Sequence, residues 1–161
     1  MVPYAASLTE FETAGKLVEG QAFLDSLQQS RASDENLATT LGLSYDKANQ
    51  PDKAVEVYKK LLVANDKSTG IRWALANLYD KMGKTAEASA EYKTLLDQRP
   101  DNNDARLKYA ATLEKLGKSA EALAEYKKVQ QTDPANEEAG AGILRLEPKP
   151  VSTDTAPAGN P

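Results

Sequence analysis

Histidine and cysteine are both absent from this chain of 161 residues. Their absence excludes Ser-His-Asp and Cys-His nucleophile systems, zinc sites built from imidazole or thiolate, iron–sulfur clusters and disulfide bonds. Carboxylates are the only plausible catalytic acids or bases that remain. No Gly-rich phosphate loop or calcium-binding loop is present either. We therefore expect a protein that is not an enzyme and has no metal or other cofactor.

A strong excess of one charge and long apolar runs are also missing. Lys and Arg number 20 against 24 Asp and Glu, a net charge of −4, which argues against binding to nucleic acid or to an anionic membrane surface. The longest obvious apolar run, residues 61–64, is far shorter than the ~18 residues that span a bilayer. No signal peptide is visible. We expect a soluble protein without membrane insertion, cytoplasmic or, if Met1 follows a removed leader, periplasmic or exported.

What the sequence does contain is an internal repeat. Residues 83–88 (GKTAEA) recur 34 positions later as residues 117–122 (GKSAEA). The same step relates Ala54, Ala88 and Ala122; Tyr58, Tyr92 and Tyr126; Leu41 and Leu75; Tyr45 and Tyr79; Pro100 and Pro134. A fixed period of this length is typical of stacked repeat architectures.

Each copy of the repeat predicts two amphipathic helices. In the third copy, apolar residues keep to one helical face in two successive stretches: Leu75, Leu78, Tyr79 and Met82, then Ala88, Tyr92, Leu95 and Leu96. Proline follows the second stretch, where it cannot continue a helix. Every copy therefore reads as a helical hairpin.

Residues suited to helix ends separate the two stretches. Gly83 and Gly117, with Asn49 in the second copy, tolerate the left-handed backbone that ends a helix. Thr85 and Ser119 follow closely, and we expect their side-chain oxygens to cap the next helix. These positions predict where the chain reverses direction inside each copy.

A small residue, a tyrosine and a proline in this order and spacing, with glycine at the helix turn, make the chain resemble a tetratricopeptide repeat protein. The resemblance covers four units, 1–34, 35–68, 69–102 and 103–136, of which the first is degenerate. It implies an all-α fold, an α-solenoid of about four tetratricopeptide-like helix pairs with a C-terminal capping helix at 137–146, so that the repeat domain occupies 1–147. Residues 148–161 are rich in Pro, Ser and Thr, and we expect a disordered tail of bacterial character.

The resemblance also implies a function. In this family the units stack into a superhelix whose concave side, lined by the first helices, forms a groove. The chain is then expected to be a non-catalytic adaptor or scaffold that binds a peptide or helix of a partner protein. Carried over from the family's groove positions, the candidate contacts are Thr39, Leu43, Lys47, Trp73, Asn77, Lys81, Leu107, Lys108 and Lys115. Leu43, Trp73 and Leu107 are expected to form an apolar strip with a polar edge.

Two roles stay open for Trp73, the only tryptophan. It is either an aromatic anchor in the groove or, because the family often has a structural Trp one position earlier, a packing residue between units. The family's clamp for a partner's C-terminal carboxylate is incomplete, because Trp73 replaces its first lysine. We therefore exclude binding of Hsp70 or Hsp90 tails. Asn77 and Lys108 remain as a pair that could hold a single carboxylate or a backbone segment.

Self-assembly is the alternative function. The first unit has Ala32 in place of the closing proline, and an imperfect end unit leaves apolar surface open to a second copy. The competing hypothesis is a structural protein that forms a homo-oligomer through its terminal repeats.

Overall fold

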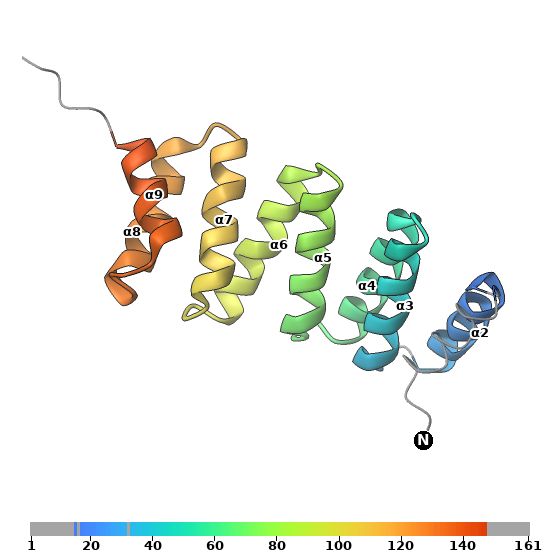
Figure 1. Ribbon diagram of the computed structural model, residues 1–161. Helices are drawn as coiled ribbons and strands as arrows, with labels where there is room; N and C mark the ends of the chain where they lie inside the picture. The colour runs from blue at the N-terminus through green and yellow to red at the C-terminus, as the bar shows by residue number, and fades with distance from the viewer. Residues whose placement is uncertain (1–14, 16, 32, 148–161) are drawn as a thin grey trace, which may run out of the picture.

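The computed structural model describes residues 15, 17–31 and 33–147, and within them the only regular elements are helices. Their bounds are α2 (Leu17–Ser30), α3 (Glu35–Lys47), α4 (Pro51–Ala64), α5 (Thr69–Lys81), α6 (Thr85–Gln98), α7 (Asn103–Lys115), α8 (Ser119–Thr132) and α9 (Glu137–Leu146). Figure 1 shows them following one another along an elongated stack. The prediction of an all-α solenoid with a C-terminal capping helix is confirmed. The expected tail at 148–161 and residues 1–14 of the first unit lie outside the described residues.

The turns inside the helix pairs have the left-handed backbone that the sequence predicts. Asn49, Gly83 and Gly117 have φ angles of 57°, 72° and 75°. The backbone N–H that follows each of them donates to a carbonyl five residues back, as Lys84 N does to Tyr79 O at 2.9 Å. This bond satisfies a carbonyl at the end of the first helix and reverses the chain.

The second helices begin differently from the prediction. Thr85 and Ser119 are the first helical residues of α6 and α8, and the cap positions belong to Lys84 and Lys118, which make no side-chain capping bond. Thr85 Oγ1 instead donates to Gly83 O at 3.5 Å. The capping role predicted for Thr85 and Ser119 is wrong because the left-handed turn leaves only one residue between its glycine and the next helix.

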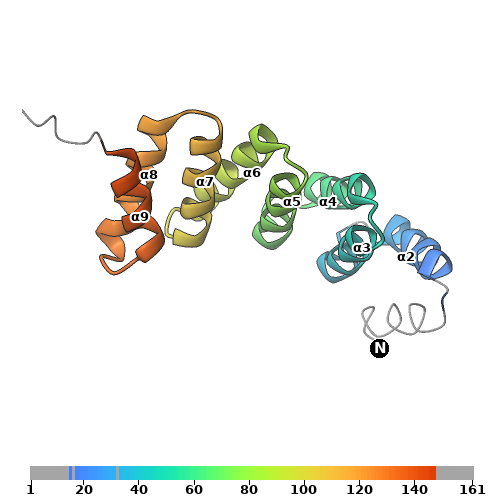
Figure 2. The ribbon, with the colours of Figure 1, turned by 45° about the horizontal axis from the view of Figure 1, so that its top comes forward.

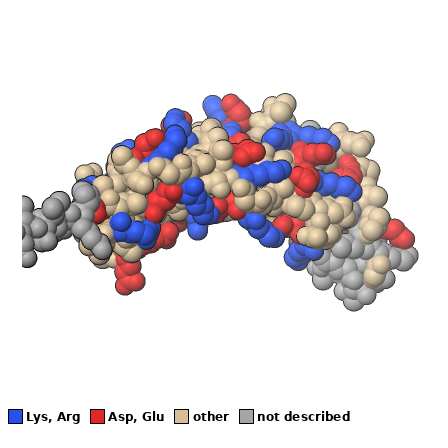
Figure 3. All heavy atoms as spheres, turned by 90° about the horizontal axis from the view of Figure 1, so that it is seen from above, with Lys and Arg blue, Asp and Glu red and all other residues tan. Residues whose placement is uncertain are grey.

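Each pair puts its first helix on one side of the stack and its second helix on the other. In Figure 1, α3, α5 and α7 lie in front of α4, α6 and α8, and Figure 2 shows the same alternation from a tilted direction. Seen from above, the molecule is an arc that is hollow on the side of the first helices (Figure 3). The first helices therefore line a concave face.

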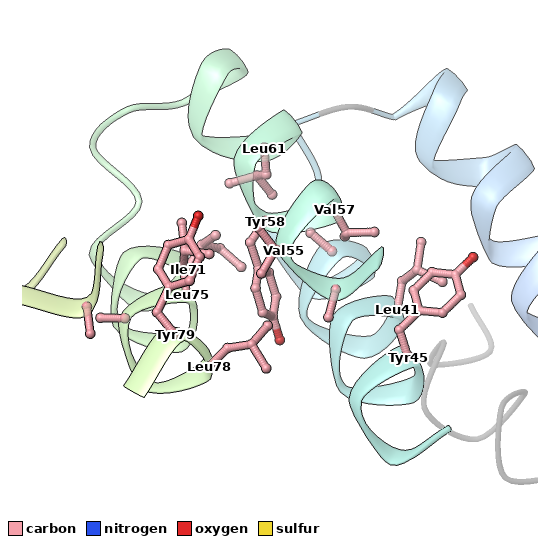
Figure 4. Close-up of a cluster of buried hydrophobic side chains, with 14 of the residues drawn as sticks. Leu41, Tyr45, Val55, Val57, Tyr58, Leu61, Ile71, Leu75, Leu78 and Tyr79 are labelled. Carbon is pink, nitrogen blue, oxygen red and sulfur yellow. The ribbon is translucent and has the colours of Figure 1, made fainter. Parts of the chain in front are cut away.

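Consecutive pairs share their core. One buried cluster draws on four helices and includes Leu41 of α3, Tyr58 of α4, Leu75 of α5 and Tyr92 of α6. Figure 4 shows the Tyr58 ring between α3 and the side chains of α5. A second cluster joins α7, α8 and α9, and the half-buried Tyr109 packs against both clusters and against a third one. No described helix pair has an interior of its own.

Two of the pairs also contain an ion pair between their helices. Arg72 Nη1 lies 2.7 Å from Glu91 Oε2, and Arg106 Nη1 lies 2.7 Å from Glu125 Oε2. Burial alone would raise the pKa of Glu125, but hydrogen bonds from Lys128 and Arg106 hold it below its usual value. In the α3/α4 pair, buried apolar residues occupy the equivalent positions.

The capping helix α9 approaches α8 closely at a glycine. A Cβ atom on Gly142 would lie 2.6 Å from ring carbons of Tyr126, whose side chain is fully enclosed. A Cβ atom on Gly140, one half-turn earlier in the same helix, would meet nothing nearer than Gln130 Nε2 at 3.9 Å. The contact between α8 and α9 thus requires a residue without a side chain at position 142 only.

This difference yields a prediction for two identical substitutions in one helix. Gly142→Ala forces the Tyr126 ring to move and should lower the free energy of unfolding by about 1–3 kcal/mol. Gly140→Ala should be neutral or raise it by up to about 1 kcal/mol, because alanine favours helix. Urea unfolding followed by circular dichroism measures both. Equal effects of the two variants would contradict the packing described for α9.

Candidate functional site

The concave side is hollowed between α3 and α5. The hollow has a volume of about 230 Å³ and is lined by Leu43, Asp46, Tyr58, Ala74, Asn77, Leu78 and Lys81. Leu43, Asn77 and Lys81 are candidate contacts from the sequence, and their places on two adjacent first helices bring them together here. Leu43 is 52% exposed, whereas Tyr58 and Leu78 are buried. The hollow therefore combines an apolar lining with an exposed leucine and charged groups.

Tyr58 is the one lining residue that comes from a second helix. Its burial, with a smaller effect from the Asp46 carboxylate, raises its pKa to about 12. The equivalent Tyr92 and Tyr126 also have a pKa well above the usual range, chiefly because they are buried. At neutral pH all three hydroxyls stay protonated and do not act as bases. Those of Tyr92 and Tyr126 donate hydrogen bonds to Asn77 and Glu114.

Asn77 is held by its own unit. Its Oδ1 accepts a hydrogen bond from the Tyr92 hydroxyl at 2.7 Å, and its Nδ2 donates to the Trp73 carbonyl at 3.0 Å. An amide carries two donor hydrogens and one acceptor oxygen, so these bonds use much of what Asn77 offers. The side chain is consequently fixed at the edge of the hollow, and its main partners are internal.

Trp73 packs inside the stack. It is half-buried, and its ring meets that of Tyr92 edge to face, with centroids 5.7 Å apart and an angle of 67°. It also contacts two of the core clusters. Of the two roles left open by the sequence, the structure displays packing contacts, and the contact with Tyr92 lies within one helix pair.

Ion pairs connect the ends of successive first helices. The pairs are Lys81 with Asp46, Lys115 with Asp80, and Arg145 with Glu114. The Nζ–Oδ1 distances in the first two are 2.7 and 2.5 Å, and the guanidinium of Arg145 forks onto Glu114 at 2.9 and 2.5 Å. Figure 3 shows both signs of charge interspersed over the face that it displays. The candidate cations Lys81 and Lys115 are thus already paired with the preceding unit.

The other candidates lie in different environments. Thr39 Oγ1 donates to the carbonyl of Glu35 in its own helix at 2.7 Å. Lys47 is exposed at the end of α3, and Lys108 is exposed on α7. Leu107 is only 6% exposed and belongs to the core of α7, α8 and α9. Leu43, Trp73 and Leu107 therefore differ in exposure along the expected apolar strip, and Leu43 presents the most surface.

A larger hollow, of about 660 Å³, lies outside the groove between α2 and α4. Its lining is Asp25, Gln28, Gln29, Tyr45, Lys53, Glu56, Val57, Lys60, Val63 and Ala64. Tyr45 donates a hydrogen bond to Asp25 across it, and the Lys53 ammonium lies 5.2 Å from the centre of the Tyr45 ring. Sequence reasoning missed this hollow because no motif marks it; the degenerate first unit was the only available signal.

Many polar groups on this surface are already engaged in ion pairs or hydrogen bonds, which restricts the chemistry that the surface can perform. Over residues 15, 17–31 and 33–147, no three or more carboxylates are grouped so that they could hold a metal ion. None of the helices described combines the length and the apolar character needed to cross a membrane. The site is suited to contacts with another molecule through shape, apolar surface and a few charges.

The ion pair between Glu114 and Arg145 depends on pH. Hydrogen bonds from Arg145, and a further one from Tyr126, lower its pKa although burial opposes the shift. A carboxylate with a lowered folded-state pKa contributes stability above its unfolded pKa of about 4.3, and this contribution is lost as the pH falls through the folded value.

We therefore expect Glu114→Gln to flatten the decline in the free energy of unfolding below about pH 4.3. Arg145→Ala should flatten it too, and the double variant should add little. Urea unfolding at a series of pH values measures this, with Lys108→Ala as the control for loss of one charge. The same pH slope in all variants as in the wild type would contradict the role of this ion pair.

Comparison with known proteins shows which family the chain resembles. Two family models described as tetratricopeptide repeat match residues 40–68 and 73–137, together more than half of the chain. No match was found among curated proteins.

Several solved structures have the same fold. A tetratricopeptide repeat protein from Parabacteroides merdae is 22% identical with a TM-score of 0.73; the match covers 90% of this chain, which spans 59% of that protein. YrrB, described as a TPR protein with an unusual peptide-binding site, is 19% identical with a TM-score of 0.69, over 90% of this chain and 75% of its own. The second TPR domain of human RPAP3, in complex with the HSP70 peptide SGPTIEEVD, is 20% identical with a TM-score of 0.61, over 70% and 93%. On its repeat pattern, its stacked helical hairpins and the two family models, this chain belongs to the tetratricopeptide repeat family.

Proposed function

We propose that this chain is a non-catalytic adaptor that binds an extended or helical segment of a partner protein in the concave groove lined by α3, α5 and α7. The observation that carries the proposal is the hollow between α3 and α5, where Leu43 is exposed beside the buried Leu78 and Tyr58. A concave, largely apolar surface with a few polar groups is the usual form of a binding site. A partner's apolar side chain would cover the leucine there.

Related proteins support a peptide as the ligand. Tetratricopeptide repeat proteins in general mediate protein–protein interactions. The RPAP3 domain was solved with a bound HSP70 peptide, and YrrB is described as having a peptide-binding site. A peptide segment lying along the first helices of this chain would make the same kind of complex.

The polar groups of the groove favour binding over catalysis. Asp46, Asp80 and Glu114 each face a cation from the next unit, and Tyr58 stays protonated. General acid–base catalysis needs a group with a pKa near the working pH beside a bound substrate, usually in a site that excludes water. These groups are better suited to holding the stack together.

Site-specific photo-crosslinking tests the proposal. A photoreactive amino acid replaces either Leu43, in the groove, or Val63, which is 90% exposed on α4 outside it. In cells of the source organism, position 43 should crosslink to a partner polypeptide and position 63 should not. The partner is then identified by mass spectrometry. Crosslinks to another protein from position 63 alone would place the binding surface elsewhere.

Self-assembly is the second candidate function. Val18 of α2 and Leu144 of α9, the first and last described helices, are 75% and 81% exposed, and apolar end surfaces of repeat stacks favour association. If the chain is an adaptor, light scattering over a range of concentrations should give the monomer mass of 17.4 kDa. A mass that rises with concentration, lowered by Leu144→Ser, would favour self-assembly through the terminal repeats.

A further inference from the structure

The lining of the groove hollow repeats one unit further along with different chemistry. A shift of 34 residues carries Leu43, Ala74 and Leu78 to Asn77, Lys108 and Thr112, Tyr58 to Tyr92, and the Asp46–Lys81 ion pair to Asp80–Lys115. The tyrosine and the ion pair are therefore kept, the three apolar lining positions become polar, and the polar Asn77 is replaced by Ala111. We call the part of the groove between α3 and α5 its first step and the part between α5 and α7 its second step. The first step is mainly apolar and the second is mainly polar.

Most polar groups of the second step already have partners. The amide of Asn77 binds the Tyr92 hydroxyl and the Trp73 carbonyl. Thr112 is buried, and its hydroxyl donates to the carbonyl of Tyr109 at 2.7 Å. Groups satisfied in this way would have to give up an internal bond before they could bind a ligand.

Lys108 is the exception. Of the Lys and Arg residues on α5, α7 and α9, as far as these helices are described, it alone makes no ion pair or hydrogen bond. It is exposed in the position where Ala74 lines the first hollow. Asp104 lies one helical turn earlier and is also exposed, but no ion pair joins the two. The second step therefore offers one available positive charge.

On the basis of the proposed function, we propose that the groove recognises an extended segment carrying an aliphatic side chain and, about three residues away, an internal Asp or Glu side chain. The aliphatic group occupies the hollow beside Leu43 and Ala74, and the carboxylate pairs with Lys108. We take the separation of the two parts of the groove as about the 10 Å between packed helices, which an extended chain advancing about 3.3 Å per residue covers in about three residues.

An internal carboxylate fits this site better than a chain terminus. Lys108 is a single, flexible point charge, and the nearby amide of Asn77 is engaged, so no set of donors converges on a terminal carboxylate. One exposed ion pair adds modestly, about two- to fivefold in Kd. The apolar contact supplies more, about tenfold. The aliphatic side chain thus gives most of the affinity, and the acidic one selects among apolar segments.

Selection from a phage library of random 12-residue peptides tests this on the full chain. Enriched peptides should share Leu, Ile, Val or Met with Asp or Glu about three positions away in either order. Synthetic forms with a free or amidated C-terminus are then titrated by calorimetry. Trp73 fluorescence gives a second readout, because its ring contacts Tyr92, which is bonded to Asn77 in the hollow.

Matched variants separate the two steps of the groove. Lys108→Gln should weaken binding of the acidic peptide two- to fivefold and leave binding of its Glu→Gln form unchanged. Asp104→Asn should strengthen binding of the acidic peptide. Leu43→Asn should weaken binding of both peptides. Lys60→Gln, on the exposed side of α4, should change the binding of neither.

The outcomes distinguish this inference from the function on which it rests. Peptides that lose affinity with Leu43→Asn but not with Lys108→Gln, or that require a free C-terminus, would overturn the inference and keep groove binding. Binding that ignores both groove variants, or a selection that enriches no peptide, would contradict the proposed function itself.

Discussion

The structure depends on burial of apolar side chains between helix pairs as well as within them. A single hairpin exposes one apolar face, and only the next hairpin can cover it. Here the cluster around Leu75 draws on α3 to α6, and Tyr109 packs against all three clusters. Because consecutive pairs share buried side chains, they form one curved stack, and its first helices face a common hollow side (Figure 3). The groove is a consequence of how the core is shared.

The repeated contacts between units also determine which polar groups remain available to bind another molecule. Interactions repeated from unit to unit, such as the pairs of Lys81 with Asp46 and Lys115 with Asp80, hold adjacent first helices together. Groups used in this way contribute little to recognition. Under the proposed function, selectivity comes from positions where one unit departs from the pattern, as Leu43 and Lys108 do. In a repeat protein, those departures are the places to look for a ligand.

Local features of this fold could be predicted from the sequence, and contacts between units could not. The turn at Gly83 and the separation of first and second helices follow from short-range patterns. The sequence suggests Thr85 as a cap, but Thr85 is the first residue of α6, because the left-handed turn leaves only Lys84 between Gly83 and the helix. The pairing of Lys81 was missed, although Asp46 and Lys81 have the same spacing as Asp80 and Lys115. The burial of Leu107 depends on how α8 and α9 cover it, and no spacing within α7 reveals this.

Hydrogen exchange measured by mass spectrometry on Leu95→Ala would test the shared core most directly. Leu95 of α6 is 1% exposed and packs with Ala105 of α7, at the contact between two pairs. If the pairs depend on one another, amides in α5 and α6 and amides in α7 and α8 should lose protection together. Loss confined to α5 and α6, with α7 and α8 as protected as in the wild type, would show that each pair is stable alone and would contradict the account.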